Sequence, residues 1–400
     1  MKTNNSKIYQ RKKITKLFNQ YKIELISNLN SIIISIKSNS LFYQSNFNFQ
    51  NLQKLFIGKN RIEEIIEFIC ILIEHNMIKI EENEICLKLI LSPTLYNYPN
   101  IELILNKVLS NINLIKSINV QKDYINSISI FPSGNIISVS EDKSIIIFDI
   151  HYNILQNIQN AHDESIIYVD VKDENNFITC SYDKSIKTWI KCKDEFKMNK
   201  CINNAHKEQI NKVLYYSNSN IISCSRDYII KIWEEINNNY QLITSLSHSN
   251  CVYSILLLED INILISSGFD GTKLWNLNNF ELIKYFKKVK CQWWNALNRI
   301  DYDRIIIGDK SLIIISILKK SIIKEIKISF NCIGIKLIKE KGIFLVGGSN
   351  EDIKIYNNNN YQCIQTIKKA HKDYINGFIE LKDGLIGSFS DDGLINIWSL

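Results

Sequence analysis

HKDYING, at His371–Gly377, and QKDYINS, at Gln121–Ser127, are nearly the same seven residues written 250 positions apart. A local motif used twice would need only these two copies, whereas a repeated structural unit would place more copies between them at even spacing. Weaker copies do follow His162, His206 and His248. The quoted pair therefore marks the first and last members of a repeat array.

Each repeat places an Asp and then an aromatic residue at a near-constant distance from its first position. His162, for example, is followed by Asp183 and Trp189. The starts fall at positions 121, 162, 206, 248, 288, 329 and 371, so neighbouring starts are 40 to 44 residues apart. The repeats at 288 and 329 keep this frame only through its spacing. Seven units of this length predict a seven-bladed β-propeller with four strands in each blade.

The residues within each repeat predict strands. Runs such as NFITCS (176–181) and SIKTWI (185–190) are rich in β-branched residues and are bounded by polar turn residues. A run such as YQLITSL (240–246) then leads to the next start. The repeat region, residues 111–400, is therefore predicted to be all-β.

The seventh repeat reaches Leu400 after only three of its predicted strands. A bare strand edge would invite aggregation, so a fourth strand has to come from elsewhere. The segment INLIKSINV (112–120) precedes the first repeat and places Leu114, Ile118 and Val120 at alternating positions. We expect it to complete the last blade, to close the ring and to bury these three side chains.

Residues 111–400 resemble the WD-repeat family in these spaced His, Asp and Trp positions. The resemblance implies that a His, a strand Ser or Thr, the turn Asp and the Trp form a hydrogen-bonded group in each blade. The fourth repeat keeps His248 but has one residue fewer before its Trp, and the repeats at 121, 288 and 329 lack the His. The full matches are His162, Ser181, Asp183 and Trp189; His206, Ser225, Asp227 and Trp233; and His371, Ser390, Asp392 and Trp398.

The resemblance also implies that partners contact the face on which the loops before first strands and the turns before third strands gather. The family's contact positions are rich here in aromatic residues, with one Arg, which is typical of interface hot spots. The QWWN stretch (292–295) leaves two interpretations open: at least one Trp faces a partner, or both pack in the core. The predicted contact residues are Tyr124, Tyr182, Arg226, Tyr253, Phe269, Trp293, Tyr374 and Asp391.

The first 110 residues follow different patterns. Residues 1–22 contain seven basic residues and no acidic one, and the remaining 41 basic residues match the 41 acidic residues of the chain. The net charge of +7 therefore belongs to this segment, which we expect to be a flexible, solvated arm. The rest of the chain is neutral and has no global basic field that would recruit nucleic acid.

Residues 23–110 are predicted to form a small α-helical domain that weakly resembles a winged helix. Helices are expected over 52–73, an alternating hairpin over 78–89 and a connecting helix over 101–109. The candidate recognition helix carries Glu63, Glu64 and Glu67, which would repel phosphates. Docking to a protein, or capping of the ring, is therefore favoured over DNA binding.

The sequence favours a protein without catalysis, cofactor or metal. His206, Ser225 and Asp227 have the composition of a hydrolase triad, but the same trio recurs in three repeats, which favours a structural role. There is no phosphate-binding glycine motif and no second pair of ligands at zinc spacing. The ten cysteines are scattered, which favours the cytosol or nucleus, and no apolar run is long enough to span a bilayer.

These observations predict a non-catalytic scaffold that binds proteins or peptides, and no small-molecule substrate, on the propeller face. One alternative is a substrate receptor or adaptor subunit of a ubiquitin ligase, which rests on analogy alone. A second alternative is a nucleic-acid or chromatin adaptor that acts through the N-terminal module. Nucleic-acid binding would make capture of partners steeply dependent on salt.

Overall fold

The computed structural model describes residues 12–18, 21–28, 31–37, 42–48, 78–82, 86–91 and 101–107, and residues 112–399 except 120 and 218. The chain divides into two compact units, Met1–Asn111 and Ile112–Leu400. The domain boundary predicted from the sequence, after residue 110, differs from this division by one residue.

The described residues of the first unit form one seven-stranded sheet with the strand order β1-β2-β3-β4-β7-β6-β5. The hairpin expected over 78–89 is present as β5 and β6, which pair antiparallel from Ile78 opposite Leu91. The strands are β1 (Lys12–Phe18), β2 (Tyr21–Asn28), β3 (Ser31–Lys37), β4 (Phe42–Asn48), β5 (Ile78–Glu82), β6 (Cys86–Leu91) and β7 (Ile101–Lys107).

Two expectations for this unit are corrected. Residues 101–107 form strand β7 and not a helix, because residues 101–106 pair antiparallel with β6 and Lys107 lies opposite Tyr43 of β4. Strand β1 occupies 12–18, inside the segment expected to be a flexible arm. The helices expected over 52–73, on which the winged-helix comparison depends, lie outside the described residues.

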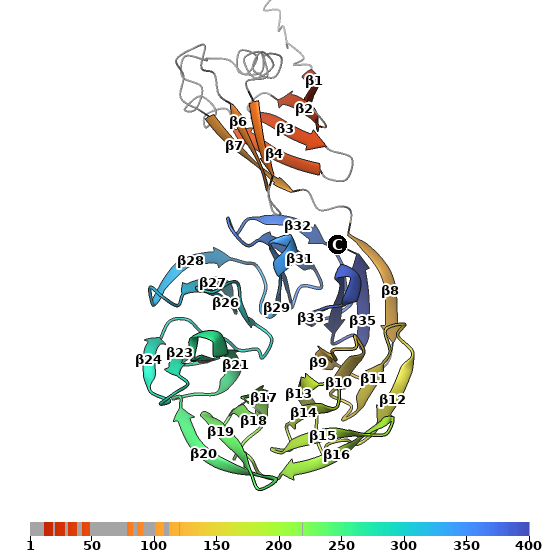
Figure 1. Ribbon diagram of the computed structural model, residues 1–400, viewed down its shortest axis with the longest axis vertical. Helices are drawn as coiled ribbons and strands as arrows, with labels where there is room; N and C mark the ends of the chain where they lie inside the picture. Colours follow the sequence, from red (N-terminus) through yellow and green to blue (C-terminus); the bar gives the residue numbers. More distant parts are fainter. Residues whose placement is uncertain are drawn as a thin grey trace, which may run out of the picture. The chain divides into compact units, whose positions relative to one another are not determined.

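The second unit is a ring of seven four-stranded antiparallel sheets, as Figure 1 shows. Blade 1 contains β9 (Ile125–Ile130), β10 (Ile136–Ser140), β11 (Ile145–Phe148) and β12 (Ile154–Ile158). Blade 2 contains β13 (Ile166–Asp173), β14 (Asn176–Ser181), β15 (Ile186–Cys192) and β16 (Glu195–Ile202). Blade 3 contains β17 (Ile210–Tyr216), β18 (Asn220–Ser225), β19 (Ile229–Ile236) and β20 (Asn239–Ser247).

Blade 4 contains β21 (Val252–Leu258), β22 (Ile263–Gly268), β23 (Gly271–Asn276) and β24 (Leu282–Phe286). Blade 5 contains β25 (Leu297–Arg299), β26 (Arg304–Gly308), β27 (Ser311–Ser316) and β28 (Ser321–Lys327). Blade 6 contains β29 (Cys332–Ile338), β30 (Ile343–Gly348), β31 (Ile353–Asn357) and β32 (Cys363–Ile367). Short 3-10 helices at Glu259–Ile261, Lys339–Lys341 and Lys382–Gly384 connect first and second strands.

Blade 7 is built from both ends of the unit. It contains β33 (Ile375–Glu380), β34 (Leu385–Ser390), β35 (Leu394–Ser399) and, as its outer strand, β8 (Asn113–Asn119). In this pairing Ile118 lies opposite Ile395, and Leu114 lies opposite Trp398. The predicted closure of the ring is therefore confirmed.

The expected burial along β8 is corrected. Ile118 is 8% exposed, but Leu114 is 49% exposed, and Val120 lies outside the described residues. An outer strand has another strand on one side only, and one of its faces meets solvent. The strand therefore stabilises the ring through its backbone pairing and through Ile118, and not through three buried aliphatic side chains.

Burial rises from the outer to the inner strands of each blade. The second strands β10 and β34 are buried at nearly every position, whereas the outer strand β28 is exposed at nearly every position. The buried strands combine Ile and Val with Ser, Cys and Gly, because small side chains let neighbouring blades approach closely. The core thus consists of the interfaces between blades.

Candidate functional site

A buried hydrogen-bonded chain joins four side chains of blade 2. His162 Nδ1 lies 2.8 Å from Asp183 Oδ2, and His162 Nε2 lies 2.8 Å from Thr179 Oγ1. The Trp189 indole N–H donates to the same hydroxyl at 2.9 Å. With the Nδ1 proton on the carboxylate side, the hydroxyl donates to Nε2 and every polar atom of the chain is satisfied.

The strand hydroxyl in this chain is Thr179 and not the predicted Ser181. The same applies to blades 3 and 7, where Ser225 and Ser390 were predicted and Ser223 and Ser388 contact the His. Blade 4, with its shortened spacing, still forms the chain through Ser266.

The predicted serines stabilise the turn instead. Ser181, Ser225 and Ser390 accept the backbone N–H of Asp183, Asp227 and Asp392 at 3.0, 3.0 and 3.1 Å. Residues two apart on a strand share a face, so spacing alone does not separate the two candidates. The position of the Trp distinguishes the two candidates. Trp189 lies opposite Phe177 on the neighbouring strand, and Thr179 is the diagonal neighbour of Trp189.

These groups contain the residue types of a hydrolase triad but lack access to a substrate. Thr179 and Ser223 have no exposed surface, and each hydroxyl is already engaged by a Trp indole. Burial lowers the pKa of His162, against the opposing effect of Asp183, so the ring is neutral. Burial also raises the pKa of Asp183, but hydrogen bonds from His162 and Ser185 outweigh it and the pKa falls below its ordinary value.

The blades without His use other contacts. In blade 1, Gln121 takes the His position and its amide donates to Ser144 at 3.3 Å. Within the described residues, no group of three or more His, Cys, Asp or Glu side chains could hold a metal ion. In the same part of the chain, no helix has both the length and the apolar character that a bilayer crossing needs.

Four of the predicted contact residues meet in one cluster on the top face, the face that carries the loops before first strands and the turns between second and third strands. The guanidinium carbon of Arg226 lies 4.7 Å from the Tyr182 ring centroid and 6.0 Å from that of Tyr253. Arg226 also donates to the Tyr182 hydroxyl at 2.5 Å. Phe269 packs edge-on against Tyr253 at 5.3 Å. We call Tyr182, Arg226, Tyr253 and Phe269 the aromatic–arginine cluster.

Three other predicted residues lie together in blades 1 and 7. Tyr124 and Tyr374 are among the more exposed aromatic side chains of the propeller, at 44% and 43%. Asp391 donates its backbone N–H to the Tyr374 carbonyl. Burial raises the pKa of Asp391 to about 6, and the nearby Asp373 and Glu141 add to this effect. This side of the top face is acidic, whereas the aromatic–arginine cluster carries a cation.

The two tryptophans of QWWN have different positions. Trp293 is half-buried against the core of blades 4 to 6, and its ring meets that of Trp294 at 5.9 Å. Trp294 is 6% exposed, and its indole N–H donates at 3.0 Å to the carbonyl of Asn126 in blade 1. Trp294 is therefore a core residue, which answers half of the question that the sequence leaves open.

Trp294 and Asn295 connect blade 5 to blades on the far side of the ring, and we call them the plug. The Trp294 carbonyl accepts from Lys212 at 3.0 Å and from Ser254 at 2.8 Å. The Asn295 amide donates to the Asn376 carbonyl at 2.9 Å. Burial lowers the pKa of Lys212 to about 8. The sequence signal for the plug is the pair of Trp residues in the repeat that has lost its His.

Comparisons with known proteins agree with this geometry. Residues 112–149, 154–189 and 199–234 match the family described as "WD domain, G-beta repeat". A stretch of 72 residues is 36% identical to "Lissencephaly-1 homolog 1" of Paramecium tetraurelia, and it spans 17% of this chain and 17% of that relative. Three stretches of the chain therefore match WD40 repeats, and residues 112–399 form a seven-bladed β-propeller.

Proposed function

We propose that this protein is a non-catalytic scaffold that binds a protein or peptide segment at the aromatic–arginine cluster. The three WD40 matches and the seven-bladed ring support this proposal, because a WD40 propeller is a typical protein-interaction scaffold. The observation that supports a specific place on the propeller is the stacking of Arg226 between tyrosine rings contributed by blades 2 and 4.

The cluster has the physical properties of a binding hot spot. Its rings are held by each other and by Arg226, so little side-chain entropy remains to be lost when a partner binds. Arg226 contacts the Tyr182 hydroxyl and the Asn211 side-chain oxygen, and it has no carboxylate partner within the described residues. A partner that brings a carboxylate or a backbone carbonyl to Arg226 would gain a charge-assisted hydrogen bond beside aromatic surface.

The experiment compares partner capture by the full chain and by a variant with Arg226→Ala and Tyr253→Ala. Removal of hot-spot side chains costs at least about 2 kcal/mol each, so recovery of partners at limiting concentration should fall about tenfold or more. Quantitative mass spectrometry of the captured proteins measures this loss.

The matched control is Lys324→Ala, because Lys324 lies exposed on the outer strand β28. It should leave capture unchanged, and both variants should keep the strand content of the parent by circular dichroism. If the double variant retains every partner at parental levels, the aromatic–arginine cluster is not the binding site.

A further inference from the structure

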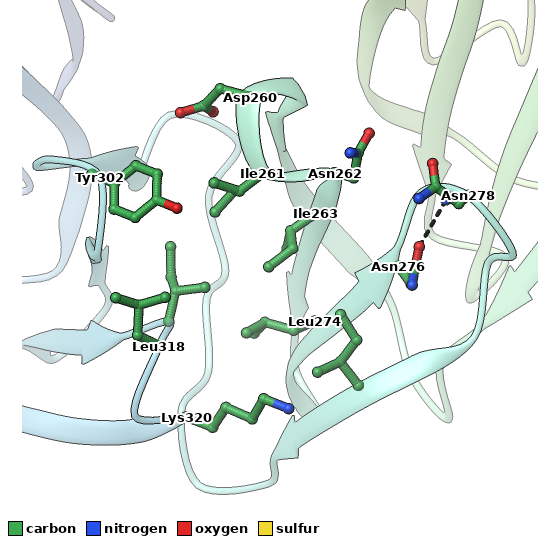
Figure 2. Close-up of a pocket in the computed structure, with 12 residues that line it drawn as sticks. Asp260, Ile261, Asn262, Ile263, Leu274, Asn276, Asn278, Tyr302, Leu318 and Lys320 are labelled. Carbon is green, nitrogen blue, oxygen red and sulfur yellow. Dashed lines mark hydrogen bonds between the residues drawn. The ribbon is translucent and has the colours of Figure 1, made fainter.

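One groove of the propeller lies on the bottom face, opposite the aromatic–arginine cluster. Its volume is about 520 Å³, which is within the usual range of about 300–1,000 Å³ for ligand pockets. Its walls come from β22, β23 and β24 of blade 4 and from the loops between first and second strands and between third and fourth strands of blades 4 and 5 (Figure 2). The apolar lining is Ile261, Ile263, Leu274, Ile283, Ile317 and Leu318.

The other blade interfaces show what normally fills this position. Tyr152, Phe280 and Tyr361 occupy one equivalent turn position between third and fourth strands, with φ values of 68°, 59° and 60°. Each packs toward the preceding blade. Tyr152 lies under Lys116 of the closing strand β8, and Tyr361 accepts a hydrogen bond from Arg304 of blade 5 at 2.6 Å.

Blades 2 and 3 achieve the same contact from the beginning of the fourth strand. Phe196 stacks on Phe131 of blade 1 at 5.2 Å, and Tyr240 lies 5.4 Å from Lys200 of blade 2. Each hairpin between third and fourth strands in blades 1, 2, 3, 4 and 6 therefore supplies one aromatic side chain to the interface before it.

Blade 5 differs from all of these hairpins. Its turn position is Lys320, with a φ of 49°, and Lys320 lines the groove between blades 4 and 5. The groove is therefore open at the place where five other interfaces are closed by an aromatic ring. Tyr302 and Leu318 stand on its rim at 59% and 64% exposure, so apolar surface continues to solvent.

The charge of the groove favours an acidic partner. Asp260 also lines it, but both of its oxygens accept from Arg299 at 2.7 Å. Lys320 has no carboxylate partner within the described residues. Among the residues that line the groove, Lys320 therefore carries the charge that is left without an ion-pair partner, while the neighbouring Asp303 carboxylate is held by the Ser316 hydroxyl and the Leu318 N–H.

We propose that this groove binds an aromatic side chain of an acidic peptide segment from a partner protein. The ring occupies the position that an aromatic side chain of the chain itself fills at the other interfaces, and it packs on the partly exposed side chains of Ile263 and Ile283. A carboxylate next to the ring in the peptide pairs with Lys320. This second docking surface lies on the opposite face from the one proposed above and is independent of it.

The test uses a fluorescein-labelled peptide, Gly-Glu-Asp-Phe-Leu-Asp-Glu-Gly, and the full chain, with binding measured by fluorescence anisotropy. The Lys320→Tyr variant places the missing aromatic in the groove, at a backbone conformation that Phe280 and Tyr361 already adopt. It should weaken peptide binding about tenfold or more and should raise the melting temperature, because the ring buries the groove walls.

Three controls keep this result interpretable. A peptide with Ser in place of Phe and Leu, and one with Lys in place of its acidic residues, should each bind about tenfold more weakly than the parent peptide. Lys324→Ala, on the exposed outer strand β28, should leave binding unchanged, which controls for loss of a surface lysine outside the groove. Equal binding of the parent peptide to the chain and to Lys320→Tyr, or equal binding of the Ser or Lys peptide, would overturn the proposal.

Discussion

Blades 3 and 5 have the same four-stranded architecture but are held in place by different contacts. Blade 3 is tied together locally, by His206, Asp227, Ser223 and Trp233 within one repeat. Blade 5 has Lys288, Asp309 and Ile315 at the equivalent His, Asp and Trp positions, and its first strand β25 spans only three residues. The residues that β25 does not use form the plug, which contacts five other blades, blade 6 through the Asn295 carbonyl and the Ile335 N–H.

The difference shows that a propeller blade can exchange local for long-range stabilisation. Loss of the His–Asp contact releases the segment before the first strand from its own blade. In blade 5 this segment extends into the centre of the ring, and the hairpin on the other side of the blade leaves the groove at Lys320. The least regular blade therefore carries both the contacts that span the ring and the open site on the bottom face.

The first way to test this comparison is to remove long-range pairing entirely. Deletion of residues 113–119 removes β8 together with the buried side chain of Ile118. The edge of β35 is then left without a partner strand. If the hydrogen-bonded groups within each blade were enough to hold the blades in place, this deletion would lower the free energy of unfolding only slightly. We expect the ring to open and to lose a large part of a typical folding free energy of about 5–15 kcal/mol, seen as a lower melting temperature by calorimetry.

Leu114→Ala is the matched control on the same strand. Leu114 is half-exposed, so this change should alter stability by no more than about 0.5 kcal/mol. A deletion variant that melts at the parental temperature would show that β8 is dispensable and that each blade is stable through its own contacts.

The second test concerns the plug. Trp294→Ala removes a buried indole and its hydrogen bond to Asn126, and we expect a loss of about 3–5 kcal/mol in the free energy of unfolding, measured by urea denaturation. Trp293→Ala is the control. Because Trp293 is only half-buried, this substitution should lower the free energy of unfolding by less than Trp294→Ala. A larger loss for Trp293 than for Trp294 would contradict the assignment of the plug.

The regular blades could be predicted from the sequence because their signals are local and repeated. The spacing from His to Asp to Trp fixed the number of repeats, and the unpaired third strand before Leu400 pointed to residues 112–120 as the closing strand. The number of repeats follows from residues within each repeat, and the closing strand follows from the need to cover an exposed strand edge. The choice between Thr179 and Ser181 was missed because both occupy the same face of β14.

Blade 5 was harder to predict because its stabilising partners lie far away in the sequence. The contact of Trp294 with Asn126 joins residues 168 positions apart, and no spacing within the repeat encodes it. The groove has a signal in the sequence, because the residue five positions after the Trp position of the repeat is aromatic in blades 4 and 6, as Phe280 and Tyr361, but is Lys320 in blade 5. In the first unit, the strand Ile101–Lys107 was mistaken for a helix, because Ile104 interrupts the alternation of its apolar residues and its pairing partners in β6 and β4 lie outside the segment.

The smallest expected effect concerns the local contact of the regular blades. His162→Gln introduces into blade 2 the residue type that blade 1 carries at Gln121. The variant loses the hydrogen bond to Asp183 or to Thr179, because one amide does not span both as the ring does. We expect a loss of about 1–3 kcal/mol at pH 7.5, measured by urea denaturation.

The dependence of this loss on pH tests whether His162 is neutral in the folded blade. Burial holds the pKa of His162 below its unfolded value of about 6.5, so below that pH the unfolded chain binds a proton that the folded chain does not. The contribution of His162 to stability is therefore complete above about pH 6.5 and declines as the pH falls. The difference between parent and variant should narrow from pH 7.5 to pH 5.5. Asp170 and Asp391, whose pKa values are raised to about 6, titrate in both proteins and cancel in the difference. A difference that widens in acid would mean that the folded blade holds His162 as a cation.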